Sequence, residues 1–452
     1  MPRLSSSVLV LRGEEVLLGH RIPALRFFGD YFAFPGGKLE PGDGEGEQGL
    51  RACALRELGE EIGLDLGTRD LGRLETLATV TTPPFAPVRY QTVFFLLRLG
   101  EGEVPGLSSG EFDELRWMRP RDALRSWTRG EMRIVPPVLL FLRLLAEHGA
   151  EGLPEAAGAQ EKLLEQGQLH PVYFSPGILL APLKTPTVPP ATTTNTLVVG
   201  ERLLYLVDPG SGDPEEWARL DERLDFFCRM GARVLGILLT HSHPDHVGGV
   251  LHFAKERGLP VLAAEKSLAQ LPLEVHGVEQ RVLVQGDRIE LGEAPDGSEG
   301  WRLEVHETPG HHPGHLAFFE TRYRSLIAGD LCSTLSTIVI DPHEGHLGTY
   351  LESLQRMREL EIETLYPAHG PAHPRGRELL QFFIDHRKER EDKLLSILRE
   401  GVGELAALLH RTYDDVDPDQ LPYALRSLLS GLQKLEEEGR IRKRGEIWEM
   451  RA

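Results

Sequence analysis

The chain of 452 residues is too long for one ordinary hydrophobic core, so we expect at least two domains. Hydrophobic residues make up 40% of it and charged residues 26%, as in water-soluble globular proteins. The formal net charge of −19 disfavours non-specific binding to nucleic acid or to an anionic membrane, so an anionic substrate would need a metal ion or a focused cationic pocket. The three cysteines are isolated, which favours a reducing compartment, and we expect a cytoplasmic protein.

The first predicted domain covers residues 1–150. Its start, SSSVLVLRGEEVLLGHR, has short apolar runs interrupted by RGEE, which predicts a β-hairpin and neither a signal peptide nor a membrane span. Further on, TVFFLLRL indicates a strand, whereas residues 51–61 and PPVLLFLRLLAEHG indicate helices. Residues 151–170 are rich in Ala, Gly, Glu and Gln and lack a strong apolar face, so we predict a linker with a short surface helix.

A candidate metal-binding face lies on the first predicted helix, in the segment RELGEEIG. Glu57, Glu60 and Glu61 are three and four residues apart, so they lie on adjacent turns of one face. Leu50 and Ala54 belong to the same stripe, and carboxylates that continue an apolar row are costly unless a cation binds them. The alternative is a solvated charged face. Mg²⁺ or Mn²⁺ with a bound diphosphate would suit these carboxylates.

This segment resembles the second half of the Nudix box, Gx5Ex7REUxEExGU, in which U is an aliphatic residue. The resemblance implies an α/β/α sandwich that hydrolyses a diphosphate, with Glu57 and Glu61 as catalytic metal ligands and Glu60 and Arg56 beside them. The stretch LLGHRIPALRFFGDYFAFPGGKLE is similar to the coenzyme A diphosphatase signature, which implies a phosphate contact for Arg26. The alternative is a non-catalytic Nudix domain that senses a ligand.

The first half of the box, PGGKLEPGD, lies too far from the second half. Counting forward from Gly37 places the outer carboxylate at Asp43, whereas counting back from Arg56 places Gln48 there, a difference of five residues. The candidates for this carboxylate are Asp43, Glu45 and Glu47. We expect the extra residues to form a loop ahead of the helix.

The second predicted domain covers residues 171–374, in which strands alternate with helices, as in a layered α/β domain. The segment LLTHSHPDHVGG follows an apolar strand and supplies four ligand-type side chains, His241, His243, Asp245 and His246. Imidazole and carboxylate groups together suit zinc, and also iron or manganese. Repulsion among titratable groups packed so closely disfavours the alternative, a plain polar loop. Three further candidates end later apolar segments, namely His311, Asp330 and His369.

The ordered motifs HxHxDH, GH, GD and AHG resemble those of the metallo-β-lactamase superfamily. The resemblance implies an αββα sandwich that holds two metal ions, Zn²⁺ or else iron or manganese, and hydrolyses its substrate with a bridging hydroxide. One ion is then bound by His241, His243 and His311. The other is bound by Asp245, which is also catalytic, His246 and His369. Asp330 bridges the ions, and Asp208 supports the ligands from behind. Apart from the resemblance, His315 lies close in sequence to the proposed ligands and is a candidate for a substrate-contacting or supporting group, with a loop or surface position as the alternative.

Two expectations concern the surroundings of these motifs. The segment 333–354 is expected to line the substrate pocket. Four other histidines are expected in loops or on the surface, namely His312, His343, His346 and His373.

The third predicted domain covers residues 375–452. Five leucines recur at helical spacing, Leu425, Leu428, Leu429, Leu432 and Leu435. RIRKRGEIWEM then predicts a hairpin that turns at Gly445, and helices followed by a hairpin indicate a winged helix. The basic RIRKRG could contact a phosphate backbone, but the acidic KLEEEG beside it opposes this, so we favour structural packing or homodimerisation over nucleic-acid binding.

TTTNTLVVG, HRKEREDKLL and the winged helix are similar to one branch of the metallo-β-lactamase superfamily, which includes a mitochondrial single-strand endoribonuclease and polyketide thioesterases. We therefore expect a metal-dependent hydrolase of a thioester or a phosphodiester, joined to a Nudix domain that hydrolyses coenzyme A or a nucleoside diphosphate derivative. The expected partners are small molecules, an acyl thioester or a diphosphate, without a membrane. The alternative is a single-strand RNA endonuclease with a sensing Nudix domain.

Overall fold

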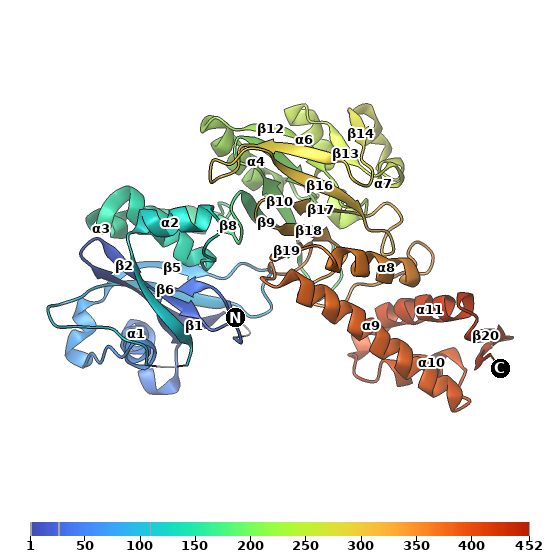
Figure 1. Cartoon of the computed structure of the whole chain (residues 1–452), viewed down its shortest axis with the longest axis horizontal. Coiled ribbons are helices and arrows are strands. Elements are labelled where there is room, and N and C mark those ends of the chain that lie inside the picture. Colours follow the sequence, from blue (N-terminus) through green and yellow to red (C-terminus); the bar gives the residue numbers. More distant parts are fainter. Residues whose placement is uncertain (1, 26–27, 109, 452) are drawn as a thin grey trace.

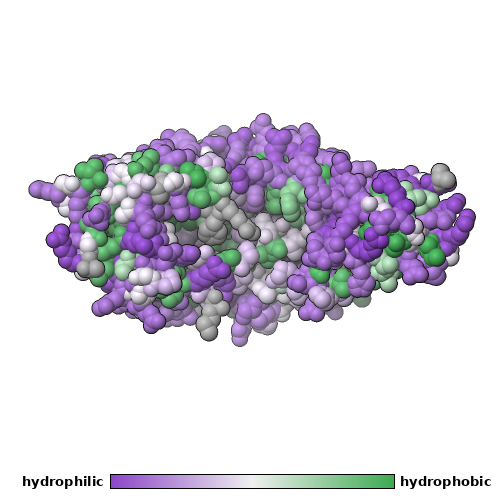
Figure 2. Space-filling view, turned by 90° about the horizontal axis from the view of Figure 1, so that it is seen from below, coloured by the Kyte–Doolittle hydropathy of each residue, from purple (hydrophilic) through white to green (hydrophobic). Residues whose placement is uncertain are grey.

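The computed structural model describes residues 2–25, 28–108 and 110–451, and three domains follow one another along its longest axis (Figure 1). Arg26, for which a phosphate contact was predicted, lies outside the described residues. None of the described helices is long and apolar enough to cross a membrane. On the face shown in Figure 2, hydrophilic residues predominate and hydrophobic residues are gathered in small groups.

The N-terminal domain is built around one mixed sheet. Its strands are β1 (Arg3–Arg12), β2 (Glu15–Arg21), β3 (Phe32–Ala33), β4 (Gly36–Lys38), β5 (Glu75–Thr81), β6 (Tyr90–Arg98) and β7 (Phe112–Met118). The main order is β3-β2-β1-β6-β5, while β4 pairs with β1 and β7 pairs with β2. Helix α1 (Gly46–Ile62) covers one face, and α2 (Pro120–Thr128) and α3 (Pro136–Glu165) cover the other (Figure 1). This confirms the expected α/β/α sandwich.

The predicted hairpin at the start of the chain is formed by β1 and β2. Leu11 pairs with Val16 across the turn, and Gly13 has a φ of 61°, a left-handed conformation that glycine adopts without steric cost. Three successive residues of β1 are buried, Val8, Leu9 and Val10. Consecutive burial requires cover on both faces of the sheet, which the helices provide.

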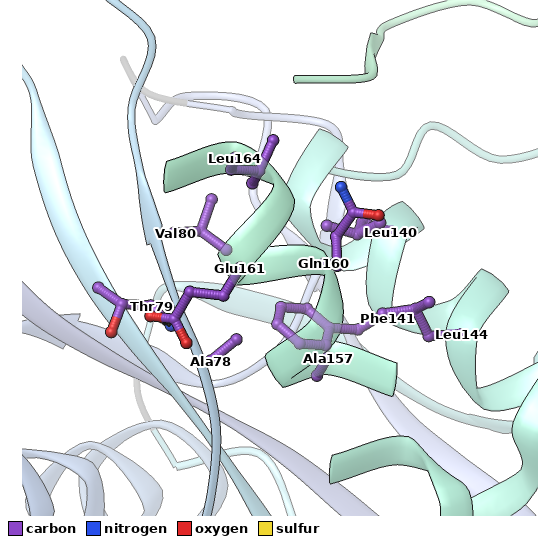
Figure 3. Close-up of a pocket in the computed structure, with 10 residues that line it drawn as sticks. All are labelled: Ala78, Thr79, Val80, Leu140, Phe141, Leu144, Ala157, Gln160, Glu161 and Leu164. Carbon is purple, nitrogen blue, oxygen red and sulfur yellow. Dashed lines mark hydrogen bonds between the residues drawn. The ribbon is translucent and has the colours of Figure 1, made fainter. Parts of the chain in front are cut away.

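The segment 151–170, predicted as a linker, is mostly helical and packed. Helix α3 bends at Gly149, where φ is 68°, and continues to Glu165. Leu153 and Ala157 are buried, and Glu161 accepts a hydrogen bond from the backbone N–H of Thr79 at 2.9 Å (Figure 3). The linker prediction therefore needs correction. Two buried apolar side chains, Leu153 and Ala157, and the hydrogen bond of Glu161 to the edge strand β5 are enough to pack this helix against the domain.

The second domain contains two stacked sheets. The first has the order β14-β13-β12-β11-β10-β9-β8, and the second has the order β15-β16-β17-β18-β19. The first-sheet strands are β8 (Val172–Tyr173), β9 (Ile178–Lys184), β10 (Thr193–Val199), β11 (Leu203–Val207), β12 (Arg233–Leu238), β13 (Val261–Ala263) and β14 (Gln280–Val282). The second-sheet strands are β15 (Arg288–Gly292), β16 (Trp301–Glu307), β17 (Leu316–Glu320), β18 (Ser325–Gly329) and β19 (Thr364–Pro367).

Helices cover both outer faces of these sheets. Those after the first-sheet strands are α4 (Pro214–Arg229), α5 (Pro244–Val247), α6 (Val250–Arg257) and α7 (Glu265–Ala269). Leu220 of α4 and Phe253 of α6 are fully buried against the first sheet. On the other side, α8 (Leu347–Arg358) and α9 (Gly376–Arg399) bury Leu354 and Phe383 against the second sheet. The αββα sandwich is thereby confirmed.

The C-terminal domain is a small helical unit with a two-stranded wing. It comprises the end of α9, α10 (Leu405–Thr412), α11 (Leu421–Glu437), β20 (Ile441–Arg444) and β21 (Ile447–Met450). Of the five predicted leucines, Leu428, Leu432 and Leu435 are fully buried in its core. The wing turns at Gly445, whose φ is 63°, as predicted.

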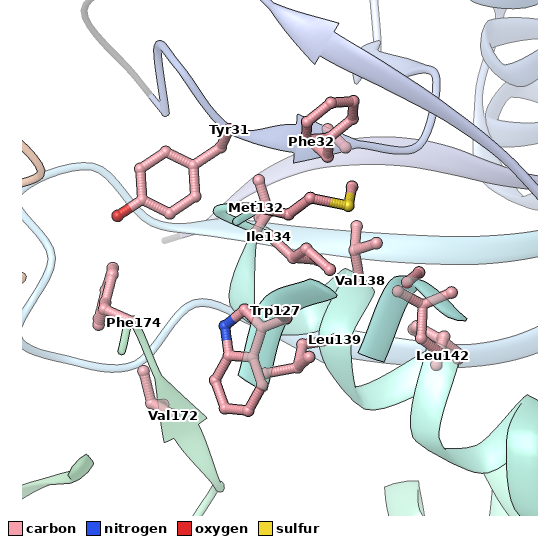
Figure 4. Close-up of a cluster of buried hydrophobic side chains, with 14 of the residues drawn as sticks. Tyr31, Phe32, Trp127, Met132, Ile134, Val138, Leu139, Leu142, Val172 and Phe174 are labelled. Carbon is pink, nitrogen blue, oxygen red and sulfur yellow. The ribbon is translucent and has the colours of Figure 1, made fainter. Parts of the chain in front are cut away.

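One continuous hydrophobic cluster joins the first two domains. Figure 4 shows Trp127 and Ile134 of the N-terminal domain in the same cluster as Val172 and Phe174, which lie at the start of the second domain. Polar contacts flank this cluster. The Tyr323 hydroxyl donates to the carbonyl of Thr128 at 2.7 Å. The two domains therefore share a core, which a flexible linker would not allow.

A buried carboxylate, Glu320, lies at the edge of this shared core. It accepts hydrogen bonds from the Trp301 indole at 2.5 Å and from the backbone N–H groups of Arg322 at 2.6 Å and Tyr323 at 2.9 Å. Glu320 is fully buried, and burial raises its pKa to about 7 despite these donors.

We expect this carboxyl group to make stability depend on pH. Between about 4.5 and about 7 the unfolded glutamate has lost its proton while folded Glu320 keeps it, so the free energy of unfolding falls as pH rises. Glu320→Gln removes this titration, which is worth up to about 3 kcal/mol, so the melting temperature of the variant relative to wild type should rise between about pH 5 and about pH 8. Thermal denaturation at both pH values tests this, and a difference that does not change with pH would contradict it.

Candidate metal centres

The candidate ligands of the second domain lie where strands end at one edge of the sandwich. Asp330 directly follows β18 and His369 lies two residues after β19, and these strands are parallel neighbours, so their carboxyl ends meet. His311 lies in the loop after β16. The remaining ligands follow β12, where Pro244 begins the one-turn helix α5 and returns His246 to the cluster.

Three histidines and one aspartate form the first group of candidate ligand atoms. His243 Nδ1 lies 3.0 Å from His241 Nε2 and 3.1 Å from His311 Nε2. In a tetrahedral zinc site with bonds of about 2.0–2.1 Å, ligand nitrogens are roughly 3.3 Å apart, so these separations fit one shared zinc ion. Asp330 Oδ2 completes the group, 3.3 Å from His311 Nε2.

Asp245, His246 and His369 form the second group. His369 Nε2 lies 3.5 Å from Asp245 Oδ2 and 3.3 Å from Asp330 Oδ1. His246 Nε2 lies 3.7 Å from the same oxygen of Asp330. The two oxygens of Asp330 therefore face one group each, which is the placement that a bridging ligand needs.

Every histidine of the two groups has its other ring nitrogen engaged outside the cluster. The outer partners are Thr240 Oγ1 for His241, Glu344 Oε2 for His243, Asp208 Oδ2 for His246, Val339 O for His311 and Thr193 O for His369, at 2.8–3.1 Å. All of these oxygens can accept a hydrogen bond. They therefore hold the ring proton on the outer nitrogen and leave the inner lone pair free for a metal ion.

Asp208 lies where the resemblance placed it, behind the ligands. Besides His246, it accepts the backbone N–H of Thr240 at 2.8 Å and the Thr240 hydroxyl at 2.6 Å. Its own φ is 47°, an uncommon left-handed value for a residue that is not glycine. The carboxylate is thus fixed by three donors and by a strained backbone.

The charges of the cluster fit bound metal ions. His246 Nε2 and Asp330 Oδ1 are buried and have no hydrogen-bond partner. Burial lowers the pKa of His241 well below its usual value, which keeps this imidazole neutral, as a ligand must be. Burial also opposes a charge on His246, but Asp245 and Asp208 raise its pKa to about 10. The cluster thus attracts the positive charge that two metal ions would supply.

His315 supports the cluster and does not face a substrate. It is almost fully buried, its Nδ1 lies 2.7 Å from Thr308 Oγ1, and its Nε2 accepts the backbone N–H of Asp330 at 3.1 Å. Of the two roles predicted for His315, these contacts favour the supporting one.

Two residues near the cluster were not found from the sequence. His312, expected in a loop or on the surface, lies in the loop between β16 and β17 but is fully buried, and its ring centre lies 5.3 Å from that of His243. Glu344 contacts His243 and lies 3.3 Å from His312 Nε2. Neither residue has a motif, since both are brought to the site by loop packing. Glu344 does lie within the segment 333–354, which was expected to line the pocket.

In the N-terminal domain, the carboxylates of Glu57 and Glu61 on α1 lie beside the two glycines that begin β4. Glu61 is buried and accepts the backbone N–H of Gly36 at 2.8 Å. Glu57 lies so close to Gly37 that a Cβ at that position would be 2.1 Å from Glu57 Oε1. Burial, together with the charges of Glu57 and Glu111, raises the pKa of Glu61 to about 8 despite the hydrogen bond from Gly36. The stripe of Leu50, Ala54, Glu57 and Glu61 is therefore directed inwards, as predicted.

Among the described residues, both groups with metal-type geometry lie in the second domain. Glu60 is 58% exposed and pairs with Arg56 at 3.0 Å. Glu111, from the loop before β7, was not predicted. It adds a third carboxylate near Glu57 and Glu61, but it is paired with Arg21 at 3.4 Å.

Among the three candidates for the outer carboxylate, Asp43 is the one that Arg56 holds. Arg56 donates from Nε to Asp43 Oδ1 and from Nη2 to Asp43 Oδ2, both at 3.0 Å, and Asp43 is 5% exposed. Glu47 instead pairs with Arg51 on the surface at 2.7 Å. The expected loop is only partly a loop, because residues 46–50 form the first turn of α1. Gly49 permits this turn, since a Cβ there would lie 2.6 Å from the carbonyl of Gly44.

We expect Asp208→Asn to weaken metal binding without unfolding the chain. The side-chain amide of asparagine has one accepting oxygen in place of two, so it cannot accept all of the hydrogen bonds that Thr240 and His246 donate to Asp208. The ring proton of His246 can then move to the inner nitrogen. The zinc affinity of metal-depleted protein, measured by competition with a chelator, should fall about 10–100-fold. Asp221→Asn is the matched control, because Asp221 pairs with His252 at 2.7 Å away from the cluster. Equal zinc affinities for the two variants would argue against this role of Asp208.

We expect Asp43→Asn to destabilise the N-terminal domain by about 1–3 kcal/mol, because it breaks a two-bond pair with Arg56. Arg56 lowers the pKa of Asp43, so this contribution is present at neutral pH and is lost as the pH falls through that lowered value. Thermal denaturation of Glu45→Gln and Glu47→Gln should show changes within about 0.5 kcal/mol. A larger loss for either of these variants than for Asp43→Asn would show that the outer carboxylate lies elsewhere.

Three family models match the chain in succession. The NUDIX domain matches residues 1–137, the metallo-beta-lactamase superfamily residues 188–369, and the beta-lactamase associated winged helix domain residues 405–448. A crystal structure of a beta-lactamase domain protein from Burkholderia ambifaria has a TM-score of 0.52 and 20% identity, and covers 62% of this chain and 93% of its own length. That likeness supports the fold alone.

Curated relatives match parts of the chain. A beta-lactamase-like protein 2 homolog from Caenorhabditis elegans is 28% identical over 46% of this chain and 66% of its own length. A hydroxyacylglutathione hydrolase from Bdellovibrio bacteriovorus is 33% identical over 35% of this chain and 55% of its own length. The chain thus spans less than two thirds of either relative. These families and names support a metal-dependent hydrolase. The chain joins a Nudix domain, a metallo-beta-lactamase domain and a beta-lactamase associated winged helix domain.

Proposed function

We propose that the second domain hydrolyses an acyl thioester at its metal cluster. The observation that carries this proposal is the pair of ligand groups on either side of Asp330, with every outer ring nitrogen engaged by an acceptor. Two metal ions bound there would activate water and polarise a carbonyl group. Two relatives named hydroxyacylglutathione hydrolase favour an acyl group carried by a thiol.

Residues of this chain would handle the proton and the substrate. Asp245 is 14% exposed, and its Oδ2 lies 3.4 Å from Thr194 Oγ1 and 3.5 Å from His369 Nε2. This carboxylate is placed to orient an attacking water and to accept its proton. Thr187 Oγ1 lies 3.4 Å from His369 Nε2 and offers a hydroxyl on the same side.

Single-strand RNA is the less favoured substrate because charges near the site and on the wing oppose it. Glu344, 34% exposed, adds negative charge beside His243. On the wing, Arg440 pairs with Glu391 and Glu438, and Arg442 pairs with Glu449 at 2.6 Å. These pairings reduce the positive charge with which the wing could attract a phosphate backbone, although Lys443 stays exposed over the Trp448 ring.

For the N-terminal domain we propose hydrolysis of a diphosphate that depends on Mg²⁺ or Mn²⁺. Glu57 and Glu61 lie beside the backbone of Gly36 and Gly37, and Arg56 is held by Asp43, so the inner half of the box is complete despite the insertion. Coenzyme A and nucleoside diphosphate derivatives are the candidate substrates. A ligand-sensing domain without turnover is the competing function.

A substrate panel on the full chain tests both proposals. Wild type, Glu61→Gln and Asp245→Ala are assayed for release of free thiol from acyl-coenzyme A and acyl-glutathione, for cleavage of coenzyme A at its diphosphate, and for cleavage of single-stranded RNA. We expect Asp245→Ala to lose at least about 100-fold of thioester turnover and to keep diphosphatase activity, and Glu61→Gln to show the reverse.

Each of the two proposals would be contradicted by a different result. If metal-loaded wild type cleaves RNA but no thioester, and Asp245→Ala abolishes the cleavage, the substrate class proposed for the second domain is wrong. If wild type binds coenzyme A without cleaving it, and Glu61→Gln binds equally well, the N-terminal domain is a sensor.

A further inference from the structure

The loop between β18 and α8, residues 331–346, supports two ligands of the first metal group. We call it the site loop. The carbonyl of Val339 accepts from His311 Nδ1 at 2.8 Å, and Glu344 Oε2 lies 2.9 Å from His243 Nε2. The orientation of both imidazoles therefore depends on where this loop lies.

Glu344 connects the site loop to a second, buried histidine. Its other carboxylate oxygen lies 3.3 Å from His312 Nε2, which also contacts Ser242 Oγ at 3.0 Å and Gln270 Oε1 at 2.5 Å. Ser242 lies between the ligands His241 and His243 in the sequence. One carboxylate on the site loop thus holds both a ligand and the packing behind the ligand segment.

The site loop is held from outside by the C-terminal domain and α9. Arg387 of α9 is buried and donates to the carbonyl of Ile338, directly before Val339. Arg426 of α11 lies 3.4 Å from Asp341 Oδ2. Glu437 of α11 lies 2.6 Å from His346 Nε2. These three contacts therefore surround the two loop residues that hold the metal ligands.

The contact with Glu437 does not need a charged histidine. His346 Nδ1 accepts the backbone N–H of Thr349 at 3.1 Å, so its Nε2 carries the proton and donates to Glu437. Helix α11 also packs against the start of α8, because Gly431 of α11 lies near Leu347, the first residue of α8. The end of the site loop is thus fixed against α11 by both polar and apolar contacts.

We propose that the C-terminal domain clamps the site loop and thereby positions His243 and His311 for metal binding. The winged helix is then part of the metal centre, and Glu344, Arg426 and Glu437 are positioning residues. This inference rests on the proposed metal-dependent function of the second domain, but it concerns metal binding and not the substrate.

The exposure of the ion pairs that hold the site loop guides the choice of variants. Arg426 and Glu437 are 57% and 50% exposed, and single exposed ion pairs contribute little, so each single substitution should have a small effect on zinc affinity. The double variant Arg426→Ala/Glu437→Ala releases both contacts of α11 at once. Arg387 is left intact, because loss of a buried arginine would threaten folding.

The test measures the zinc affinity of metal-depleted full-length protein by competition with a chromophoric chelator. We expect the double variant to bind zinc about threefold to tenfold more weakly than wild type, at or below the low end of the range for a direct outer partner. Glu344→Ala, which removes a direct partner of His243, should lose about tenfold or more. Glu344→Gln keeps an accepting oxygen and should retain most of the affinity.

Arg411→Ala/Glu400→Ala is the matched control. It breaks an ion pair of 2.7 Å in the same domain, with exposures of 43% and 53%, that does not touch the site loop. A double variant with the same zinc affinity and melting temperature as this control would overturn the proposal. If the double variant does not fold, Arg426→Leu/Glu437→Leu, which keeps side-chain bulk and removes both polar contacts, takes its place, and a zinc affinity equal to that of the control would overturn the proposal.

This readout separates the clamp from the substrate proposal. Wild type that binds zinc tightly but releases no thiol would remove the thioester proposal and leave the clamp intact. Normal thioester hydrolysis by wild type, together with unchanged zinc affinity in the double variant, would remove the clamp alone.

Discussion

The second domain depends on one constraint, which is that lone pairs from four separate chain segments must point at the same small volume. Imidazole nitrogens 3.0–3.1 Å apart are tolerable if one donates its proton to the other or if a cation lies between their lone pairs. The outer acceptors hold the ring proton on the far side for every histidine of both groups, so the inner lone pairs face one another. A bound metal ion would then remove the repulsion between them. The strand ends, the strained Asp208 and the site loop all serve this arrangement.

The same constraint explains why the three domains are so closely joined. The outer acceptors are carbonyls and carboxylates on loops, and a loop holds an atom in place only if something holds the loop. For Val339 and Glu344, the contacts that hold the loop come from α9, which covers the second sheet, and from α11 of the C-terminal domain. On the other side, the sandwich shares a hydrophobic core with the Nudix domain through Trp127 and Phe174. The domain that holds the candidate metal centre is therefore packed against both of its neighbours.

The sequence was informative where chemistry and chain order coincide. His241, His243, Asp245 and His246 lie in six consecutive positions, and Asp330 and His369 end apolar strands, so the motif and the topology predict the same edge of the sheets. Outer partners such as Val339 and Thr193 act through backbone carbonyls, which no residue type reveals. Glu344 and His312 carry suitable groups, but only tertiary packing places them within reach.

In the N-terminal domain, local geometry favours one of the positions that the sequence left open for the outer carboxylate of the Nudix box. Arg56 has one guanidinium group and three acidic partners, and its two parallel bonds go to Asp43 because a short 3-10 helix (Pro41–Asp43) turns that carboxylate inwards. The five extra residues then have to follow Asp43. Most of them extend α1 towards its N-terminus, where Glu47 pairs with Arg51, so the insertion lengthens the helix while Glu57 and Glu61 stay beside Gly36 and Gly37 of β4. An insertion is tolerable in a metal-binding motif when it extends an element at the end away from the ligands.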